Sequence, residues 1–387
     1  MRVLMIHSYY RQRGGEDAIF EQESQLIGQS EEVQTLVFRN EEGRRGALQF
    51  FASIWNRSAA ARLKKAIHAF RPDIIHIHNF HFGTGPLIIR TARRHGIPVV
   101  CTINNYRLLC PSATFLHDGQ LFTDSIHASF PWKAVSKKVY RNSTLLTFWL
   151  AFIIWFHKKT GTWKKVDRFI VNTDFAKSIF ENSSLAIPAG KIVVKPNFVA
   201  PPPFDSPLKG DHLLFVGRLS PEKGIPLLIE AFSETNHTLH IAGDGPLKEL
   251  VDKASRQHAN IKFLGLLNKT QVQEAMMECK ALVFPSIWYE GMPMTIVEAF
   301  AAGVPVIASN LGAMASMIRH GYNGLHFEAG DSAGLKEQLN AWHNLDKEQI
   351  KTYRENVLDT YNTWYTAEKN KNSLLTIYKN LLTCKNN

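Results

Sequence analysis

Two carboxylates flank a turn between residues 283 and 312, and both are of a type that binds sugar hydroxyl groups. The apolar run at 281–284 predicts a buried strand, and Pro293 suits the first turn of a following helix. Glu290 lies in the intervening loop, and Glu298 lies one to two turns into the helix. Because carboxylates accept hydrogen bonds from vicinal hydroxyls, Glu298 would suit a ribose and Glu290 a sugar.

The start of that helix could hold the phosphates that join such a ribose and sugar. The apolar run at 304–308 predicts the next strand, so the helix begins at the carboxyl end of a parallel strand, where open α/β sheets bind ligands. Free amides at a helix N-terminus favour an anion. The alternative is that the two acids only complement the helix dipole. The residues expected around a diphosphate are Gly291, Met292, Pro293, Met294 and Thr295.

A basic loop follows the predicted strand at 213–216. Arg218 offers a two-pronged guanidinium and Lys223 a compact charge, and Gly217 precedes both on the same loop. The two cations would neutralise a diphosphate leaving group. The alternative is a basic surface loop without a ligand.

A glycine turn at Gly243 follows the predicted strand at 239–242. Gly243 and Gly245 half match the G-x-G-x-x-G fingerprint of dinucleotide-binding proteins. Lys248 stands where the third glycine belongs, and Pro246 starts the helix, so a dehydrogenase is a poor interpretation.

Three motifs together resemble those of the retaining glycosyltransferases of family 4, both in their order and in their separations. They are the loop with Arg218 and Lys223, the turn at Gly243, and the pair Glu290 and Glu298. The resemblance covers nearly the whole chain. It implies an α/β protein of the GT-B fold, in which two doubly wound Rossmann-like domains face each other across a cleft and a C-terminal helix crosses back to the first domain. It also implies transfer of a sugar from a nucleotide-diphosphate sugar to a hydroxyl of a glycan or lipid-linked acceptor, with retention of configuration. Surface polysaccharide or glycolipid assembly is the setting that family habit suggests.

The resemblance also assigns roles by position. Gly14 and Gly15, after the first strand, would face the donor diphosphate, and Leu266 would border the nucleobase. The expected catalytic residues are Glu290, Arg218, Lys223 and Asn104, and the donor site adds Gly217, Gly243 and Glu298. The residues expected on the acceptor side are His78, Asn105, Tyr106 and Arg107. The nucleotide sugar is a co-substrate, and no resident cofactor or metal ion is expected.

Asn104 departs from the family pattern, because relatives carry a histidine there that faces the donor sugar. Asparagine still hydrogen-bonds sugar hydroxyls but cannot titrate. The leaving phosphate itself can take the acceptor's proton in that case. The alternative is a catalytically inert GT-B subunit that binds nucleotide sugar or scaffolds a glycan assembly complex, and turnover would argue against it.

Two histidines, His76 and His78, share one face of a predicted strand at 74–78, a spacing that metal ligands also use. No carboxylate or thiol cluster accompanies them in the sequence, so we predict no metal site. We expect His78 in the cleft and His76 in the core.

The length of 387 residues suffices for two domains, and 45% hydrophobic residues suffice for a substantial core. We expect an N-terminal acceptor-side domain at 1–199 and a proline-rich linker at 200–211. A nucleotide-sugar-binding domain should follow at 212–360, and the returning helix at 361–387. Within the first domain, residues 48–70 are predicted to be helical.

The net charge of +11 indicates an anionic partner: nucleic acid, a membrane surface or a phosphorylated substrate. Basic residues at 133–165 surround an apolar run at 145–156, which is shorter than the roughly 20 residues that span a bilayer. This pattern is typical of an interfacial helix on an anionic membrane, with a core helix as the alternative. No base-reading motif accompanies the charges, so nucleic acid is not expected. The 4 scattered cysteines and a first strand near Met1 predict a cytoplasmic protein, or one peripheral on the inner face of the cytoplasmic membrane.

Overall fold

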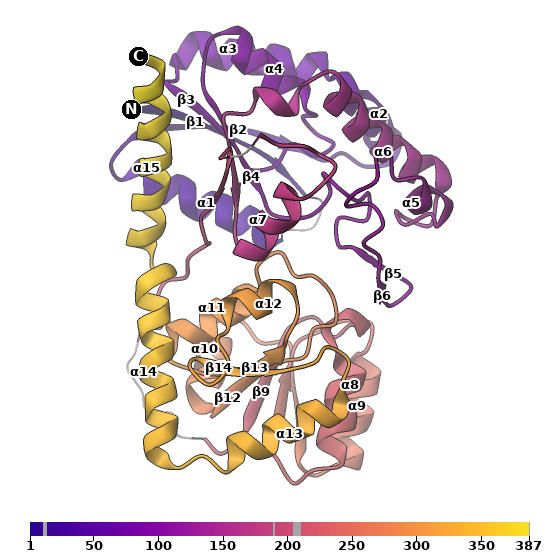
Figure 1. Cartoon of the computed structure of the whole chain (residues 1–387), viewed down its shortest axis with the longest axis vertical. Coiled ribbons are helices and arrows are strands. Elements are labelled where there is room, and N and C mark those ends of the chain that lie inside the picture. Colours follow the sequence, from indigo (N-terminus) through magenta and orange to yellow (C-terminus); the bar gives the residue numbers. More distant parts are fainter. Residues whose placement is uncertain (11–13, 189, 204–209, 387) are drawn as a thin grey trace. The chain divides into compact units, whose positions relative to one another are not determined.

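The computed structural model describes residues 1–10, 14–188, 190–203 and 210–386, and its contacts divide the chain into two compact units (Figure 1). Unit 1 comprises Met1–His117, Phe122–Pro196 and Asn370–Asn387, and unit 2 comprises Asp118–Leu121 and Asn197–Lys369. Residues 204–209 of the predicted linker lie outside the described residues.

Unit 1 contains a parallel sheet in the order β2-β1-β3-β4-β7-β8. Its strands are β1 (Arg2–Tyr9), β2 (Glu32–Arg39), β3 (Ile74–Ile77), β4 (Val99–Ile103), β7 (Arg168–Val171) and β8 (Ile192–Val194). A short hairpin, β5 (Leu116–His117) and β6 (Gln120–Leu121), stands apart from this sheet. From β1 the chain goes to β2 on one side, and it then crosses to β3 on the other side of β1. The topological switch point therefore lies between β1 and β3.

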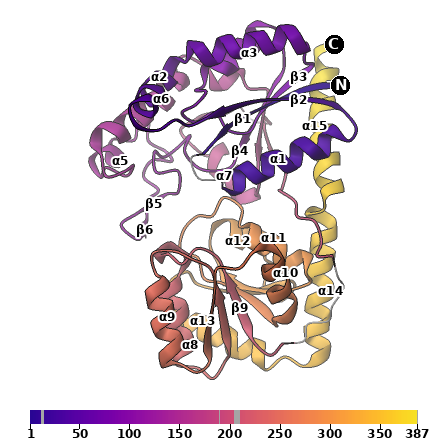
Figure 2. The same ribbon diagram turned by 180° about the vertical axis from the view of Figure 1, so that it is seen from behind.

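Helices cover both faces of this sheet, with α1 and α3 on opposite sides of it (Figure 2). They are α1 (Gly15–Gly28), α2 (Gly43–Ala52), α3 (Arg57–Phe70), α4 (Leu87–Arg94), α5 (Trp132–Ser136), α6 (Thr144–Lys159), α7 (Asp174–Glu181) and α15 (Ala367–Asn386). The last helix packs Leu374 and Tyr378 into the same buried cluster as Val3, Met5 and Phe20. The C-terminal helix therefore returns to the first domain, as predicted.

Most of the residues predicted to be helical over 48–70 are helical, but the chain breaks the helix at Asn56. The Asn56 side chain accepts a hydrogen bond from the Ala59 N–H at 2.9 Å and so caps the start of α3. The preceding helix, α2, begins earlier than predicted, at Gly43, and buries none of its side chains.

Unit 2 contains a second parallel sheet in the order β11-β10-β9-β12-β13-β14. Its strands are β9 (Leu213–Val216), β10 (Leu239–Ala242), β11 (Ile261–Gly265), β12 (Ala281–Phe284), β13 (Val306–Ser309) and β14 (Gly324–Phe327). Here the switch point lies between β9 and β12. The two predicted charged loops leave these two strands, so both loops start at the position where such sheets bind ligands.

Each face of the second sheet has its own apolar core, and α8 and α9 lie side by side over one of them (Figure 2). The helices are α8 (Ile225–Ser233), α9 (Lys248–Gln257), α10 (Lys269–Glu278), α11 (Met294–Ala301), α12 (Gly312–Met317), α13 (Ser332–His343) and α14 (Lys347–Trp364). Val357 and Tyr361 of α14 are buried in the core of unit 2. The chain therefore leaves unit 2 after Lys369, rather than near 361 as the sequence suggests.

Candidate donor and acceptor sites

The charged centre of unit 2 is an ion pair between Lys223, which follows β9, and Glu290, which follows β12. The Lys223 Nζ lies 2.6 Å from the Glu290 Oε1. The same oxygen accepts hydrogen bonds from the Ser286 Oγ at 2.8 Å and the Trp288 Nε1 at 2.7 Å. The Lys223 ammonium also lies 5.3 Å from the centroid of the Phe284 ring. Glu290 is therefore a fixed, charged acceptor beside a cation that keeps two more N–H donors.

The two loops that carry this pair are packed backbone against backbone. Gly224 has a φ of 74°, and a Cβ on it would lie 2.0 Å from the carbonyl oxygen of Pro285. The Ile287 N–H donates to the Glu222 carbonyl oxygen at 3.0 Å. Only glycine fits at 224, because a side chain there would meet rigid backbone in a left-handed conformation. The close approach holds Lys223 beside Glu290.

Arg218 is exposed, and no carboxylate of a described residue lies within ion-pair distance of it. Its neighbour Gly217 donates its N–H to the Ala242 carbonyl oxygen at 3.1 Å. A Cβ on Gly243, which has a φ of 149°, would lie 1.9 Å from the Gly217 carbonyl oxygen. The structure thus gives Gly243 a packing role: it lets the turn after β10 contact the basic loop.

The helix after Glu290 starts within the range that the sequence predicts. Pro293 is the N-cap residue with a φ of −72° and a ψ of 103°, and Met294 is the first residue of α11. Pro293 is buried, whereas the other residues predicted around the diphosphate are partly exposed: Gly291, Met292, Met294 and Thr295. The Asn197 N–H donates to the Met292 Sδ at 3.3 Å.

Glu298 lines a cavity of about 220 Å³ in unit 2. Lys269, Gln273 and Met276 of α10 line the same cavity. Burial raises the pKa of the Glu298 carboxyl, and the charge of Lys269 opposes that shift. Leu266 is 76% exposed, which is a large fraction for a leucine and is compatible with a flat partner such as a nucleobase.

The glycine pair of unit 1 starts helix α1. Both Gly14 and Gly15 are exposed, and a Cβ on either would meet no atom within 4 Å. The Gly14 N–H donates to the Asp17 Oδ2 at 3.0 Å, and the Asp17 Oδ1 lies 2.7 Å from the His7 Nε2. Burial is the main cause that lowers the pKa of His7, although Asp17 raises it. Neighbouring residues 11–13 lie outside the described part of the chain.

Sequence reasoning missed Glu16, which stands beside the two glycines. The Tyr10 hydroxyl donates to its Oε2 at 3.0 Å, and the Asn105 Nδ2 donates to its Oε1 at 2.9 Å. Burial raises the pKa of the Glu16 carboxyl. A glutamate in the first turn of a helix is common, so nothing in the sequence distinguished this one.

Asn104 and Glu16 line one small cavity at the carboxyl ends of β3 and β4, together with His81. The Asn172 Nδ2 donates to the Asn104 Oδ1 at 3.1 Å. The Asn104 Nδ2 is buried and has no hydrogen-bond partner among the described residues. An unsatisfied buried donor is costly, so this amide is suited to a hydroxyl brought by a ligand.

The two histidines of β3 belong to a buried polar cluster. The His76 ring nitrogens lie 2.6 Å from the Tyr378 hydroxyl and 2.7 Å from the Thr102 Oγ1. His78 is 3% exposed and lies 3.6 Å from Glu23, which pairs with Lys195. Burial is the main cause that lowers the pKa of His78 to about 4.

Glu23, His76 and His78 place three possible metal-ligand atoms within 4.8 Å of one another. Both nitrogens of His76 already have hydroxyl partners, and the Lys195 ammonium contacts Glu23. A resident positive charge disfavours a second cation, and the predicted absence of metal remains a prediction.

Two other residues predicted on the acceptor side have different surroundings. Tyr106 is 2% exposed, and its ring packs 4.9 Å from that of Phe115. These contacts give Tyr106 a packing role, and its predicted contact with the acceptor stays a prediction. Arg107 lines a cavity of about 840 Å³, with its guanidinium carbon 5.4 Å from the Phe82 ring centroid.

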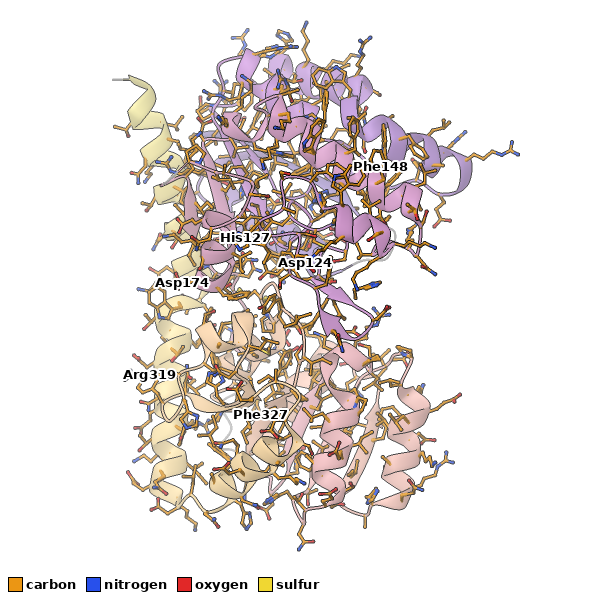
Figure 3. The ribbon with its side chains drawn as sticks, turned by 45° about the vertical axis from the view of Figure 1, so that its right-hand side comes forward. Asp124, His127, Phe148, Asp174, Arg319 and Phe327 are labelled. Atoms are coloured by element: carbon orange, nitrogen blue, oxygen red, sulfur yellow. The ribbon has the colours of Figure 1, made fainter. Side chains whose placement is uncertain are left out.

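The apolar run of the basic segment forms α6, which packs one face into unit 1. Leu150 and Ile153 are buried, whereas Leu145 and Trp132 are each 63% exposed. Phe148, labelled in Figure 3, lies 6.1 Å from the Trp132 ring, centroid to centroid. Within the described part of the chain, none of the helices combines the length and apolarity needed to cross a membrane.

The chain contains two parallel six-stranded sheets, each with helices on both faces, and its C-terminal helix returns to the first unit. This arrangement is the GT-B class of glycosyltransferase folds. The family follows from the sequence comparisons. The model described as Glycosyltransferase Family 4 matches residues 28–201, and the model described as Glycosyl transferases group 1 matches residues 201–357. The chain belongs to this family, and both the predicted fold and the predicted family are confirmed.

Individual relatives match part of the chain. The phosphatidyl-myo-inositol mannosyltransferase of Mycobacterium leprae is 34% identical over 34% of this chain and 37% of its own length. The O-antigen chain mannosyltransferase C of Escherichia coli is 29% identical over 46% of this chain and 48% of its own. The chain thus spans less than half the length of these curated relatives. The Anabaena protein HepE, solved in complex with UDP, shares the fold with a TM-score of 0.66. It is 17% identical, and the match covers 98% of this chain and 100% of that protein.

Proposed function

We propose that this protein transfers a glycosyl group from a nucleotide-diphosphate sugar to a hydroxyl of a glycan or lipid-linked acceptor, with retention of configuration. The observation that carries this proposal is the ion pair of Lys223 and Glu290 at the switch point of unit 2. A fixed carboxylate beside a cation with free N–H donors matches a ligand that presents hydroxyls next to phosphate.

The donor would bind unit 2. Lys223, Arg218 and the first amides of α11 would bind the diphosphate, because the group is anionic and these are cationic or N–H donors. Glu290 would hold the hydroxyls of the sugar, and Glu298 would hold the ribose. The family relationship and the UDP complex of a protein with the same fold support a nucleoside diphosphate as the leaving group.

The transfer step exchanges one C–O bond for another. The bond between the anomeric carbon and the phosphate oxygen breaks, and the diphosphate leaves with the electron pair. A bond from the acceptor oxygen to the same carbon forms, and the acceptor's proton passes to the leaving phosphate. The sugar becomes oxocarbenium-like in between, and the cations near the diphosphate lower the barrier by stabilising the departing charge. The chain's own cations serve this purpose, so we expect transfer to persist in EDTA.

The acceptor would bind unit 1, and a lipid-linked acceptor would bring that unit to a membrane. The exposed Trp132 and Leu145, with the lysines of the basic segment, support contact with an anionic bilayer. Sedimentation with anionic vesicles tests this point: binding should fall with salt and in the double variant Trp132→Ser, Leu145→Ser. Equal binding of both proteins would contradict it.

A thermal-shift screen tests the donor site first. UDP, GDP, ADP and CMP and their common sugars are compared on wild type, on Glu298→Ala and on the exposed control Glu337→Ala. We expect one nucleoside diphosphate to stabilise wild type and the control by several degrees through mass action, but not Glu298→Ala. No shift with any nucleotide would contradict the proposal. Binding without release of the diphosphate in the presence of acceptor glycans would favour the inert subunit.

A further inference from the structure

Unit 1 contains a cavity of about 840 Å³ that the donor site does not use. It is bordered by α2, by the exit loop of β3 and by the loop that precedes α6. Its lining includes three aromatic residues and two arginines on which the argument rests: Phe50, Phe82, Tyr140, Arg107 and Arg141.

The rings form an apolar wall. Phe50 and Tyr140 are nearly parallel, with an interplanar angle of 4° and centroids 6.3 Å apart. The Phe82 centroid lies 5.4 Å from that of Phe50. The C–H face of a pyranose ring packs well on such surfaces, and Asn40, whose Oδ1 has no hydrogen-bond partner among the described residues, lines the same cavity.

The two guanidinium groups lie against the same ring. The guanidinium carbons of Arg107 and Arg141 are each 5.5 Å from the Tyr140 centroid. Arg107 donates from Nη1 to the Pro111 carbonyl oxygen at 3.1 Å, and its buried Nε lacks a partner within the described structure. Neither arginine has a carboxylate of a described residue within ion-pair distance, although Glu41 and Glu42 line the α2 side of the cavity.

Two residues that line this cavity, and one beside it, have a left-handed backbone. Phe82 has a φ of 67°, Arg141 a φ of 52° and Asn142 a φ of 50°. A bulky residue seldom adopts the left-handed region, and such strain persists where the surrounding structure enforces it, often at ligand sites. The strain orients one ring and one guanidinium on the same cavity.

We propose that this cavity binds a sugar that carries a phosphate, with the sugar stacked on the rings and the phosphate bound by Arg107 and Arg141. The inference rests on the proposed function, for which it names the acceptor class: a phosphate-linked sugar. A planar guanidinium pairs with two phosphate oxygens at once, and two guanidinium groups that have no carboxylate partner among the described residues can recognise such a dianion. A free sugar phosphate and a lipid-linked sugar diphosphate share this group.

Calorimetric titration tests the inference on the full chain. The 1-phosphates of glucose, galactose, mannose and N-acetylglucosamine are compared with the matching methyl glycosides. The variant Arg141→Gln is compared with Arg57→Gln, which removes an exposed arginine of α3 outside the cavity. A third arm uses the same sugars as diphosphates on a short, soluble prenyl chain.

We expect at least one 1-phosphate to bind wild type and Arg57→Gln, and Arg141→Gln to bind it about tenfold or more weakly, the usual effect of a lost charge-assisted contact. Stronger binding of the prenyl diphosphate would identify a lipid-linked source, and equal binding a free one. Failure of every phosphate to bind, equal binding of the methyl glycosides, or an unaltered Arg141→Gln would overturn the inference. A nucleotide thermal shift in the same samples separates this outcome from failure of the donor site.

Discussion

Each unit contains a lysine–glutamate ion pair, and the two pairs differ in how deeply their side chains are buried. In unit 2, Lys223 and Glu290 lie on loops, with side chains 18% and 8% exposed. In unit 1, Lys195 and Glu23 lie in the core, with side chains 1% exposed each. A pair on loops can exchange partners with a ligand, whereas a pair in the core cannot without exposing the interior. We therefore expect the first pair to bind a ligand and the second to have a structural role.

The largest expected effect comes from breaking the buried pair. Lys195→Met should destabilise unit 1 by roughly 3–5 kcal/mol, because Glu23 would keep a buried charge without its cation. The double variant Glu23→Leu, Lys195→Met should recover most of that loss. Urea denaturation of the three proteins measures the effect. Equal loss in the single and double variants would show that the pair itself is not the source of the stability.

Removing the negative charge from the pair in unit 2 should instead act on transfer. Glu290→Gln keeps the size and one acceptor oxygen, but weakens the contact with Lys223 and with donor hydroxyls. We expect transfer to fall about 100-fold, the effect typical of a lost preorganised charge contact, with the melting temperature nearly unchanged. Glu337→Gln on α13 is the control. If Glu290→Gln lowered the melting temperature without a specific loss of transfer rate, the Lys223–Glu290 pair would have a structural role, like the Lys195–Glu23 pair.

Asn104 is expected to have an intermediate effect on transfer, because its amide would contribute a neutral hydrogen bond. Asn104→Ala should lower kcat/KM roughly threefold to tenfold, the value of one such bond. Asn104→Asp keeps the shape but cannot donate from that atom, and should lose a similar amount. Initial rates with saturating donor measure both variants. Unchanged rates would remove Asn104 from the site.

The smallest effect concerns acid stability. Burial is the main cause that lowers the pKa of His240 in unit 2 to about 4, below the usual 6.5. The unfolded chain therefore binds more protons between pH 6.5 and 4, and stability is lost as pH falls through that window. Because His240 is partly exposed, we expect roughly 1 kcal/mol or less after solvent screening. Calorimetry at pH 6.5 and 4.5 should show a smaller decrease in His240→Asn than in wild type.

Local patterns predicted much of the fold. The buried strands β3, β4, β9 and β12 appear as short apolar runs ended by glycine, proline or polar residues, and that signal needs no tertiary context. The break at Asn56 was missed, because apolar residues continue on both sides of it and the cap depends on a single side chain. The burial of Tyr106 was not predicted, because a motif gives position along the chain but does not tell whether a ring faces the core.

The sequence by itself determined which loops carry Arg218, Lys223 and Glu290, and the order of strands and helices that brings those loops to the carboxyl edge of a sheet. Tertiary structure alone decided that the Lys223 ammonium donates to a carboxylate oxygen of Glu290, 67 residues away in the sequence. It also decided that Tyr378 reaches His76 across 302 residues. The reason is physical: periodicity and capping act over a few residues, whereas the pairing of charges depends on strand order and on close backbone contacts such as Gly224 against Pro285.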